Sequence, residues 1–333
     1  MKQSAEHISG RGFWDKLPKP FFVLAPMADV TDAAFRRIIA KYGKPDVTWT
    51  EFVAVDGLLS AGRDILLRDL AYTEAERPIV AQVFGSKPEN FHKVAQLVSE
   101  LGFDGIDINM GCPDRNVEKQ GSGAGMIKTP ELAVDVINAT IEGANGLPVS
   151  VKTRIGYNKV ELETWLPKLL TTKLSAVTVH ARTRKEMSDV PARWEHVARA
   201  VEIAKGTGTL IIGNGDVKDL ADAREKATAT GADGVMLGRA IFGNPWQFNK
   251  EIHIEDISLE QRFAVMIEHT KLFEELLGDI KNFAVMKKHY KAYVNGFDGA
   301  KELRVKLMEA DSSADVEREV TQFLGSHTLA SVK

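Results

Sequence analysis

Reactive and polar side chains in this sequence gather directly after short apolar runs. Cys112, the only cysteine in the chain, follows one such run and precedes a glycine-rich stretch at 121–125. Lys152 follows the run "PVSV" and is expected to point into a mostly enclosed site. A thiol can donate a proton or act as a nucleophile, and an enclosed ammonium can stabilise negative charge on a bound group. The two residues therefore suggest a catalytic site for an electron-rich or anionic group.

Further polar residues stand at the carboxyl ends of the other apolar runs. They are Gln82, Asp107, Asn109, Arg154, His180, Arg182, Asn214, Asp216 and Arg239. In a barrel of parallel strands, the carboxyl ends and the loops after them form the active-site face. Any one of these residues could be a rim residue with locally satisfied hydrogen bonds, but polar residues at so many strand ends favour a shared site.

Both leading candidates also have a purely structural interpretation. Lys152 could form a buried salt bridge with Asp107 or Glu51, because a buried ammonium needs an anionic partner or a ligand. Cys112 could be a small buried apolar residue. A nucleophilic thiolate is a further alternative for Cys112, but no histidine lies nearby in the sequence to activate it.

Two glycine turns stand where barrels of this class often bind phosphate. They lie in "GNGDV" (213–217) and "GVMLGRAIFGNPW" (234–246), which contain the last two apolar runs. Gly215 and Gly238 permit a close approach to backbone N–H groups, and Arg239 adds a fixed positive charge. The sequence contains no H-E-x-x-H motif, no Cys–His cluster and no Walker A loop. We therefore expect a phosphorylated cofactor or substrate and no metal ion.

The elements that must position these residues alternate regularly along the chain. Apolar runs occur at 21–28, 46–53, 78–85, 105–111, 148–156, 176–182, 209–217 and 234–241. Amphipathic stretches such as 88–102, 130–144 and 218–230 lie between them. Eight such alternations predict an α/β protein with a closed (β/α)8 TIM barrel at 21–250. A doubly wound sheet is the alternative, but it would more often carry a G-x-G-x-x-G fingerprint, which this sequence lacks.

The strand pattern stops near residue 255, and helical periodicity replaces it. Helices are expected at 259–278, 280–297, 300–310 and 314–325. They predict a small all-helical domain at 255–333, and residues 1–20 are expected to be an N-terminal extension. Residues 281–306 contain seven Lys or Arg and two acidic residues, although the whole chain has a net charge of −3. This basic segment could be a solvated helix face or a surface for an anionic partner.

Composition places the chain among ordinary globular proteins of a reducing compartment. Hydrophobic residues make up 44% of its 333 residues and charged residues 27%. A single cysteine excludes an intramolecular disulfide framework and fits the cytosol. The first 20 residues lack the apolar core of a secretory signal, and no apolar run is long enough to span a membrane. We expect a cytoplasmic monomer with no membrane contact and no obligate protein partner.

Several motifs, taken in their order and spacing, are similar to one enzyme family. The segments are "APMADVTDAAFRR", "INMGCPDRNVEKQGSGAGMI", "VKTRIGY", "VHARTR", "GNGDV" and "GADGVMLGRAIFGNPW", followed by the basic "MKKHYKAYVNGFDGAKELRVKL". They resemble the flavin-dependent tRNA-dihydrouridine synthases over residues 20–310, and the last segment is similar to that family's helical tRNA-binding domain. "GNGDV" is shared with other FMN barrels, whereas "NMGCP" with the glycine-rich loop and the helical tail is more specific.

The resemblance implies a role for each matched position. Positions that contact FMN in the family correspond to Pro26, Met27, Ala28, Gln82, Lys152, His180, Asn214, Gly215, Asp216, Gly238 and Arg239. Positions that face the substrate correspond to Asn109, Arg154 and Arg182. Contacts to tRNA are expected from Lys287, Lys288 and Lys291, with His289, Tyr290 and Tyr293 interleaved among them. Cys112 matches the family's proton donor, and Lys152 would stabilise negative charge on the flavin.

The implied reaction is reduction of the C5–C6 double bond of specific uridines in tRNA to 5,6-dihydrouridine, with NADPH or NADH as reductant. Hydride would pass from N5 of FMN to C6, and Cys112 would give a proton to C5 from the opposite side. A thiol with a pKa of about 8.5 is mostly protonated at neutral pH and still acidic enough to donate. The uridine would have to be unstacked to reach the barrel mouth.

The chain departs from the family pattern at Asp29, where the family usually has glycine, so the turn after the first strand is expected to differ. The acidic residues near the end of the chain match nothing in the family. Two other interpretations stay open. One is an FMN barrel that acts on a free pyrimidine, like a dihydroorotate dehydrogenase, and the other is an RNA-binding barrel that has lost its flavin. The position of the modified uridine and the choice between NADPH and NADH also stay open.

Overall fold

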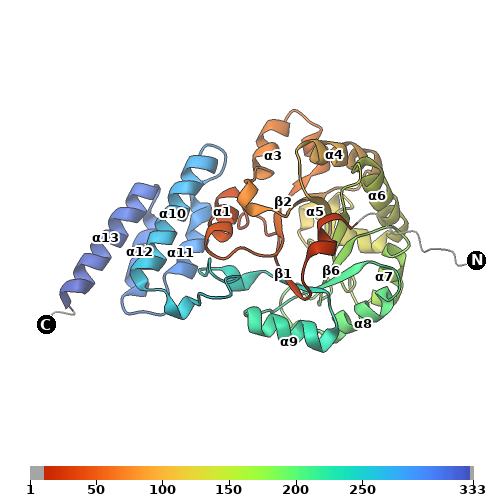
Figure 1. Ribbon diagram of the computed structural model, residues 1–333. Helices are drawn as coiled ribbons and strands as arrows, with labels where there is room; N and C mark the ends of the chain where they lie inside the picture. Colours follow the sequence, from red (N-terminus) through yellow and green to blue (C-terminus); the bar gives the residue numbers. More distant parts are fainter. Residues whose placement is uncertain (1–10, 331–333) are drawn as a thin grey trace, which may run out of the picture.

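Eight parallel strands form a closed barrel in the computed structural model, which describes residues 11–330 and the side chains through Ser326. The strands are β1 (Phe21–Leu24), β2 (Thr48–Ala54), β3 (Ile79–Phe84), β4 (Gly105–Met110), β5 (Val149–Arg154), β6 (Ala176–His180), β7 (Leu210–Asn214) and β8 (Gly234–Leu237). Their order in the sheet is β1-β8-β7-β6-β5-β4-β3-β2, and a bridge between Val23 and Val47 brings β1 against β2. The predicted (β/α)8 fold is confirmed (Figure 1).

Side chains alternate between the inside and the outside of the barrel, because successive residues of a strand point to opposite faces. The apolar filling of the barrel consists of Phe21, Val23, Ala25, Val47, Trp49, Val80, Ala176, Leu210, Ile212 and Met236, together with Trp14. On β5, Val149 and Val151 belong to the core between the barrel and its helices, whereas Ser150 and Lys152 occupy the inward positions. Toward the carboxyl ends of the strands, the inward positions become polar.

Helices surround the barrel, and several begin at a recognisable sequence signal (Figure 1). The α-helices are α1 (Ala33–Tyr42), α2 (Val55–Leu58), α3 (Arg63–Asp69), α4 (Pro88–Glu100), α5 (Arg115–Lys119), α6 (Pro130–Gly143), α7 (Leu162–Leu169), α8 (Glu195–Ala204) and α9 (Leu220–Thr230). Short 3-10 helices are η1 (Gly12–Lys16), η2 (Glu74–Glu76), η3 (Gly123–Lys128), η4 (Arg239–Ile241) and η5 (Ile254–Asp256). Asp32 and Asp219 cap α1 and α9 by accepting backbone N–H bonds, and α4 and α6 begin at proline.

The C-terminal helical part, residues 254–330, begins with η5 and contains the remaining helices. They are α10 (Leu259–Leu277), η6 (Phe283–Met286), α11 (Lys287–Tyr293), α12 (Ala300–Glu309) and α13 (Ser313–Ala330). The single helix expected at 280–297 is wrong in extent. The Asn282 side chain accepts from the N–H of Ala284 at 2.8 Å and starts a 3-10 turn, and the chain leaves the helix after Tyr293 and turns at Gly296, where φ is +80°.

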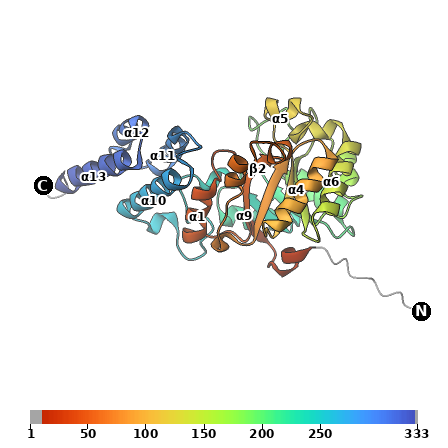
Figure 2. The ribbon, with the colours of Figure 1, turned by 90° about the horizontal axis from the view of Figure 1, so that it is seen from above.

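The C-terminal helical part packs against α1 of the barrel, and Figures 1 and 2 show α10 beside α1. Glu268 on α10 accepts from Lys41 Nζ and from the Tyr42 hydroxyl, each at 2.6 Å. The ring of Phe35 lies against the buried rings of His269 and His289. Figure 2 also shows α11 and α12 toward the same side of the molecule as α5, which follows the carboxyl end of β4.

The opposite, amino end of the barrel is covered by the chain that precedes β1. Trp14 in η1 is 1% exposed and packs its ring against Phe21 and Trp49. Figure 2 shows η1 and α5 at opposite ends of the barrel. The first half of the expected extension, residues 1–10, lies outside the described residues. None of the described helices is both long and apolar enough to cross a bilayer.

Candidate active site at the barrel mouth

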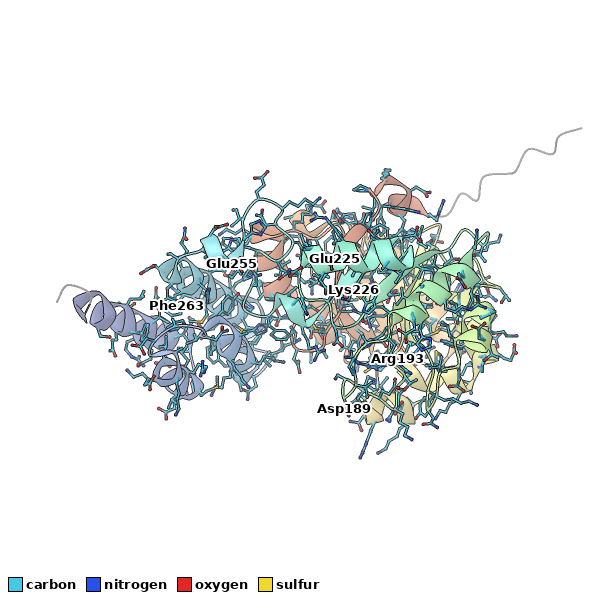
Figure 3. The ribbon with its side chains drawn as sticks, turned by 90° about the horizontal axis from the view of Figure 1, so that it is seen from below. Asp189, Arg193, Glu225, Lys226, Glu255 and Phe263 are labelled. Carbon is cyan, nitrogen blue, oxygen red and sulfur yellow. The ribbon has the colours of Figure 1, made fainter. Side chains whose placement is uncertain are left out.

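Most of the residues predicted at the strand ends meet at the carboxyl mouth of the barrel. A cavity of about 230 Å³ there is lined by Ala25, Pro26, Met27, Lys152, His180, Arg182, Ser188, Asn214, Gly215, Asp216, Val217, Met236, Gly238 and Arg239. Two residues predicted to contact the cofactor do not line it: Ala28 is exposed beside it, and Gln82 is fully buried. Figure 3 shows Asp189 and Arg193, from the loop between β6 and α8, near each other on the barrel and far from Phe263 in the C-terminal helical part.

Lys152 projects into this cavity and makes no hydrogen bond or ion pair with any described residue. The two salt bridges considered from the sequence do not form. Glu51 binds Lys281 at 2.6 Å, and Asp107 accepts hydrogen bonds from Gln82 and Ser150. Burial, reinforced by repulsion from Arg154, lowers the pKa of Lys152 to about 8. The ammonium is therefore available to a ligand.

Two arginine side chains and one histidine line the wall of the cavity around Asp216. Arg182 and Arg239 each donate to the Asp216 carboxylate, and the N–H of Ala192 donates to it at 2.9 Å. Burial and then the neighbouring cations, Lys152 first among them, hold the pKa of His180 well below its usual range. His180 is therefore a neutral imidazole, and its Nε2, 3.2 Å from a guanidinium nitrogen of Arg182, accepts a hydrogen bond.

The glycine turns border the same cavity and suit a phosphorylated ligand. Gly215 has φ of +126°, where glycine is favoured, and its carbonyl accepts from Trp194 Nε1 at 2.9 Å. A Cβ at Gly238 would lie 3.6 Å from Met27 Sδ and would occupy part of the cavity margin. Arg239 is largely exposed and reaches over the mouth. The guanidinium of Arg239, which also pairs with Asp216, and the ammonium of Lys152 are donors that fit an anionic phosphate group.

Cys112 lies half-buried in the loop that follows β4. Its backbone N–H donates to Asn109 Oδ1 at 2.9 Å, and its carbonyl accepts from the N–H of Ala124 at 2.9 Å. Burial raises the pKa of the thiol, so the group keeps its proton at neutral pH. The two hydrogen bonds hold the backbone of Cys112 in place. Its protonated thiol is suited to donating a proton and poorly suited to acting as a thiolate nucleophile.

The glycine-rich stretch after Cys112 is closed and packed against the barrel. Asp114 caps α5 by accepting from the N–H groups of the next turn. Gly123 has φ of +58°, and a Cβ there would come within 2.7 Å of the Cys112 carbonyl oxygen, so a side chain would disturb Cys112. Glu118 on α5 forms an ion pair with Arg184, in the loop after β6. These contacts fix the loop that carries the thiol.

Arg154, for which the resemblance implies a place near the substrate, is 7% exposed, and its hydrogen bonds hold two loops in place. Its Nε donates to the Gly111 carbonyl at 2.8 Å, and one terminal nitrogen donates to the carbonyls of Thr183 and Met187. Burial lowers its pKa to about 10. The guanidinium thus connects the loop that carries Cys112 with the loop after β6.

The lysines predicted to contact tRNA lie on α11, outside the mouth cavity. Lys288 and Lys291 are exposed, and Lys287 lies 3.9 Å from Asp311. The expected interleaving of surface aromatic residues with these lysines is wrong: His289, Tyr290 and Tyr293 are fully buried. They pack in the core that joins the C-terminal helical part to the barrel, because the inner face of α11 must bury apolar area.

Asp29 occupies a turn that favours glycine. Its φ is +55°, in the left-handed region, which aspartate tolerates better than most residues. Its N–H donates to Glu51 Oε1 at 2.5 Å, and its carboxylate lies 3.9 Å from Lys281 Nζ. The backbone conformation is thus one that glycine would also adopt, and the Asp29 carboxylate joins a charge cluster at the edge of the C-terminal helical part.

Two residues that shape the site gave no usable signal in the sequence. Ser188 lines the cavity from an irregular loop, where no periodicity predicts orientation. Lys281 contacts Glu51 on β2 and Asp69 on α3, which are far from it in the chain. Among the described residues, no group of three or more His, Cys, Asp or Glu side chains is arranged to hold a metal ion.

Comparison with known proteins gives consistent matches over both parts of the chain. A family model described as "Dihydrouridine synthase (Dus)" matches residues 23–328. A "Probable tRNA-dihydrouridine synthase" of Staphylococcus aureus (strain MRSA252) is 40% identical over 316 residues, which cover 93% of this chain and 95% of the relative. "Probable tRNA-dihydrouridine synthase 2" of Bacillus subtilis (strain 168) is 41% identical over 309 residues, covering 91% and 94%. Among solved structures, a variant of NCR from Zymomonas mobilis has a TM-score of 0.49 at 15% identity, covering 72% of this chain and 90% of that chain.

Proposed function

The chain belongs to the dihydrouridine synthase family, and from that premise we propose that it is a flavin-dependent enzyme that reduces uridine in tRNA to 5,6-dihydrouridine. The observation that carries the proposal is that an ammonium and a thiol lie near the same mouth, with Lys152 in the wall of the cavity and Cys112 outside that wall in the loop after β4. Lys152 is an enclosed ammonium with no carboxylate within ion-pair distance among the described residues, and Cys112 is a thiol that burial keeps protonated. The ammonium can stabilise negative charge on a bound ring system, and the thiol can donate a proton to a substrate carbon.

The cavity at the mouth would hold FMN. The backbone at Gly215 and Gly238 and the guanidinium of Arg239 would bind its phosphate, while Lys152 and His180 would lie along its ring. The remaining contacts are proposed from Pro26, Met27, Ala28, Gln82, Asn214 and Asp216. When bound, reduced FMN supplies a hydride to the C5–C6 double bond, and NADPH or NADH supplies the electrons that reduce it.

The chain's own residues would polarise and protonate the substrate. The Lys152 ammonium stabilises negative charge beside it, and the neutral His180 orients the bound group without adding charge. Cys112 holds its proton at Sγ and gives it to C5 of the base. Asn109, Arg154 and Arg182 are the side chains proposed to face the substrate.

The tRNA would contact the C-terminal helical part and present one unstacked base to the mouth. Lys287, Lys288 and Lys291 lie on α11, which faces the same side of the molecule as the carboxyl ends of the strands (Figure 2). Lysine side chains there can neutralise backbone phosphates, and a base in folded RNA must leave its stack to reach a buried site. We propose that the protein acts in the cytoplasm as a monomer.

The proposal is tested by mapping dihydrouridine in tRNA from cells that lack this protein and from the same cells complemented with wild-type or Cys112→Ala protein. We expect one or more dihydrouridines to disappear, to return with the wild type, and to stay absent with Cys112→Ala. The purified variant should keep the yellow colour of FMN and bind tRNA as the wild type does. A complete dihydrouridine pattern in the deletion strain would refute the proposed activity, and full complementation by Cys112→Ala would remove Cys112 from the mechanism.

A further inference from the structure

Asp107 is a fully buried carboxylate in the middle of β4 that has no part in the chemistry proposed above. It lies inside the barrel, outside the lining of the mouth cavity. Ser150 Oγ donates to its Oδ1 at 2.5 Å, and Gln82 Nε2 donates to its Oδ2 at 2.6 Å. The three residues stand side by side because Asp107 is in register with Gln82 on β3 and with Ser150 on β5.

A chain of hydrogen bonds leads from this carboxylate to the backbone of Cys112. Gln82 Oε1 accepts from Asn109 Nδ2 at 3.1 Å. Asn109 Oδ1 then accepts from the N–H of Gly111 at 3.1 Å and from the N–H of Cys112 at 2.9 Å. The period of two residues along β4 places Asp107 and Asn109 on the same inward face, one above the other. The path therefore rises from the barrel interior to the loop that carries the thiol.

The direction of every bond in this chain depends on Asp107. An ionised carboxylate can only accept, so Gln82 must present its NH2 group to Asp107 and its carbonyl to Asn109. Asn109 must then turn its NH2 group to Gln82, which leaves its carbonyl for the two backbone N–H groups. If Gln82 reversed, its carbonyl would face a carboxylate, and the Asn109 amide would reverse with it. The Cys112 N–H would then face another donor.

We propose that Asp107 is a positioning residue for Cys112, which it holds in place through the amides of Gln82 and Asn109. The proposal rests on the proposed function for the role of the thiol, and on the hydrogen-bond chain for its geometry. Asp107 is a fixed hydrogen-bond acceptor at one end of this path. The direction that it imposes on the Gln82 and Asn109 amides leaves an acceptor for the N–H of Cys112 at the other end. A polar residue that only fills the barrel would have no such directional effect.

The test first removes the fixed acceptor and then restores it one residue further along the path of hydrogen bonds. In Asp107→Asn, the new amide can either accept from Gln82 or donate to it, because the Ser150 hydroxyl can accept as well as donate, so both orders become possible. In the double variant Gln82→Glu/Asp107→Asn, the new asparagine amide can accept from Ser150 and donate to the new glutamate. That glutamate can only accept, and its other oxygen accepts from Asn109, so the Cys112 N–H regains its acceptor.

Cys112 itself reports the result, because it is the only cysteine in the chain. The readout is the rate of its alkylation by iodoacetamide in the purified full-length protein, together with hydrogen exchange of the Cys112 amide. Asp107→Asn should change the alkylation rate by about tenfold, the effect of losing a well-formed hydrogen bond at a buried group. The double variant should return to within about threefold of the wild type, as expected for a directly coupled pair.

Asp104→Asn is the matched control. Asp104 precedes the same strand but accepts from the N–H of Ile79 at 2.8 Å, in the turn at the amino end of the barrel, so its loss should leave the Cys112 alkylation rate unchanged. A wild-type rate in Asp107→Asn, or a double variant no closer to wild type than that single variant, would overturn the proposal. The assay uses no tRNA, so a failure of the proposed reaction would show in the dihydrouridine map and leave this result readable by itself.

Discussion

Two lysines in this protein are similarly shielded from solvent and yet electrostatically opposite. Lys281, between α10 and η6, lies 2.6 Å from Glu51, 3.2 Å from Asp69 and 3.9 Å from Asp29. Lys152, at the end of β5, has no carboxylate within ion-pair distance among the described residues. Burial would lower the pKa of Lys281, but the surrounding carboxylates outweigh burial and raise it, whereas burial lowers the pKa of Lys152 to about 8.

The difference in charged partners indicates that Lys281 stabilises the fold, whereas Lys152 is available to bind a ligand. Lys281 links the C-terminal helical part to β2 and α3, and through Glu51 it reaches the N–H of Asp29 beside the mouth. The structure tolerates Lys152 without such partners, which costs stability. An unpaired buried charge in a cavity is typical of a functional site, because its partner arrives with the ligand.

Removing the charge of Lys152 is expected to have the largest effect on activity. Lys152→Met should lower turnover by about a thousandfold, the scale on which a preorganised charge stabilises a developing opposite charge. The same variant should unfold at an equal or higher urea concentration than the wild type, because an unpaired buried cation is lost. Steady-state reduction of tRNA and urea unfolding check the two effects. A variant that is both active and less stable would show that Lys152 is a structural residue.

Removing Lys281 is expected to show the reverse pattern. Lys281→Met leaves Glu51 buried without a cation and should lower the free energy of unfolding by about 3 kcal/mol. Thermal or urea unfolding measures the change. Lys41→Met is the control, since Lys41 also forms an ion pair between the barrel and α10 but is exposed, and its loss should cost less than about 1 kcal/mol. Equal losses for the two variants would mean that Lys281 adds no more than a surface pair.

The stabilities of the wild type and of Lys152→Met should diverge in their dependence on pH. The pKa of Lys152 is about 8 in the folded protein and about 10.4 when unfolded, so between these values the unfolded state binds the extra proton. This group therefore disfavours folding below pH 8, and the penalty is relieved as the pH rises toward 10.4. Urea unfolding from pH 7 to 10 should show the wild type gaining about 2 kcal/mol relative to Lys152→Met. A constant difference across that range would mean that the pKa of Lys152 is not lowered.

Removing the exposed lysines of α11 is expected to have the smallest effect on activity. Lys288→Ala combined with Lys291→Ala should weaken tRNA binding and reduce the slope of log K against log salt by about 2. Turnover at saturating tRNA should stay close to wild type, because neither residue lines the mouth cavity. Binding titrations at several salt concentrations measure the slope. An unchanged slope would place the phosphate contacts elsewhere on the protein.

Local spacing was enough to predict the barrel and the region of its site. Eight apolar runs separated by amphipathic stretches predict the strands, and parallel strands bring their carboxyl ends to one face. The carboxyl end of each apolar run is visible in the sequence, so residues such as Lys152 and Asn214 could be assigned to the mouth, where they line the cavity. The motifs that resemble the dihydrouridine synthases lie within residues 23–328, which the family model matches.

Tertiary structure alone decided which partners these residues have. From the sequence, Glu51 was a possible ion-pair partner of Lys152, but the packing of the C-terminal helical part brings Lys281 to Glu51 instead. The same packing turns His289, Tyr290 and Tyr293 inward, although their spacing among lysines suggested a surface. Periodicity reports which face of an element a residue occupies, and it carries no information about which distant element covers that face. Charge pairing and burial depend on which distant element covers the face, and this is determined only when the chain folds.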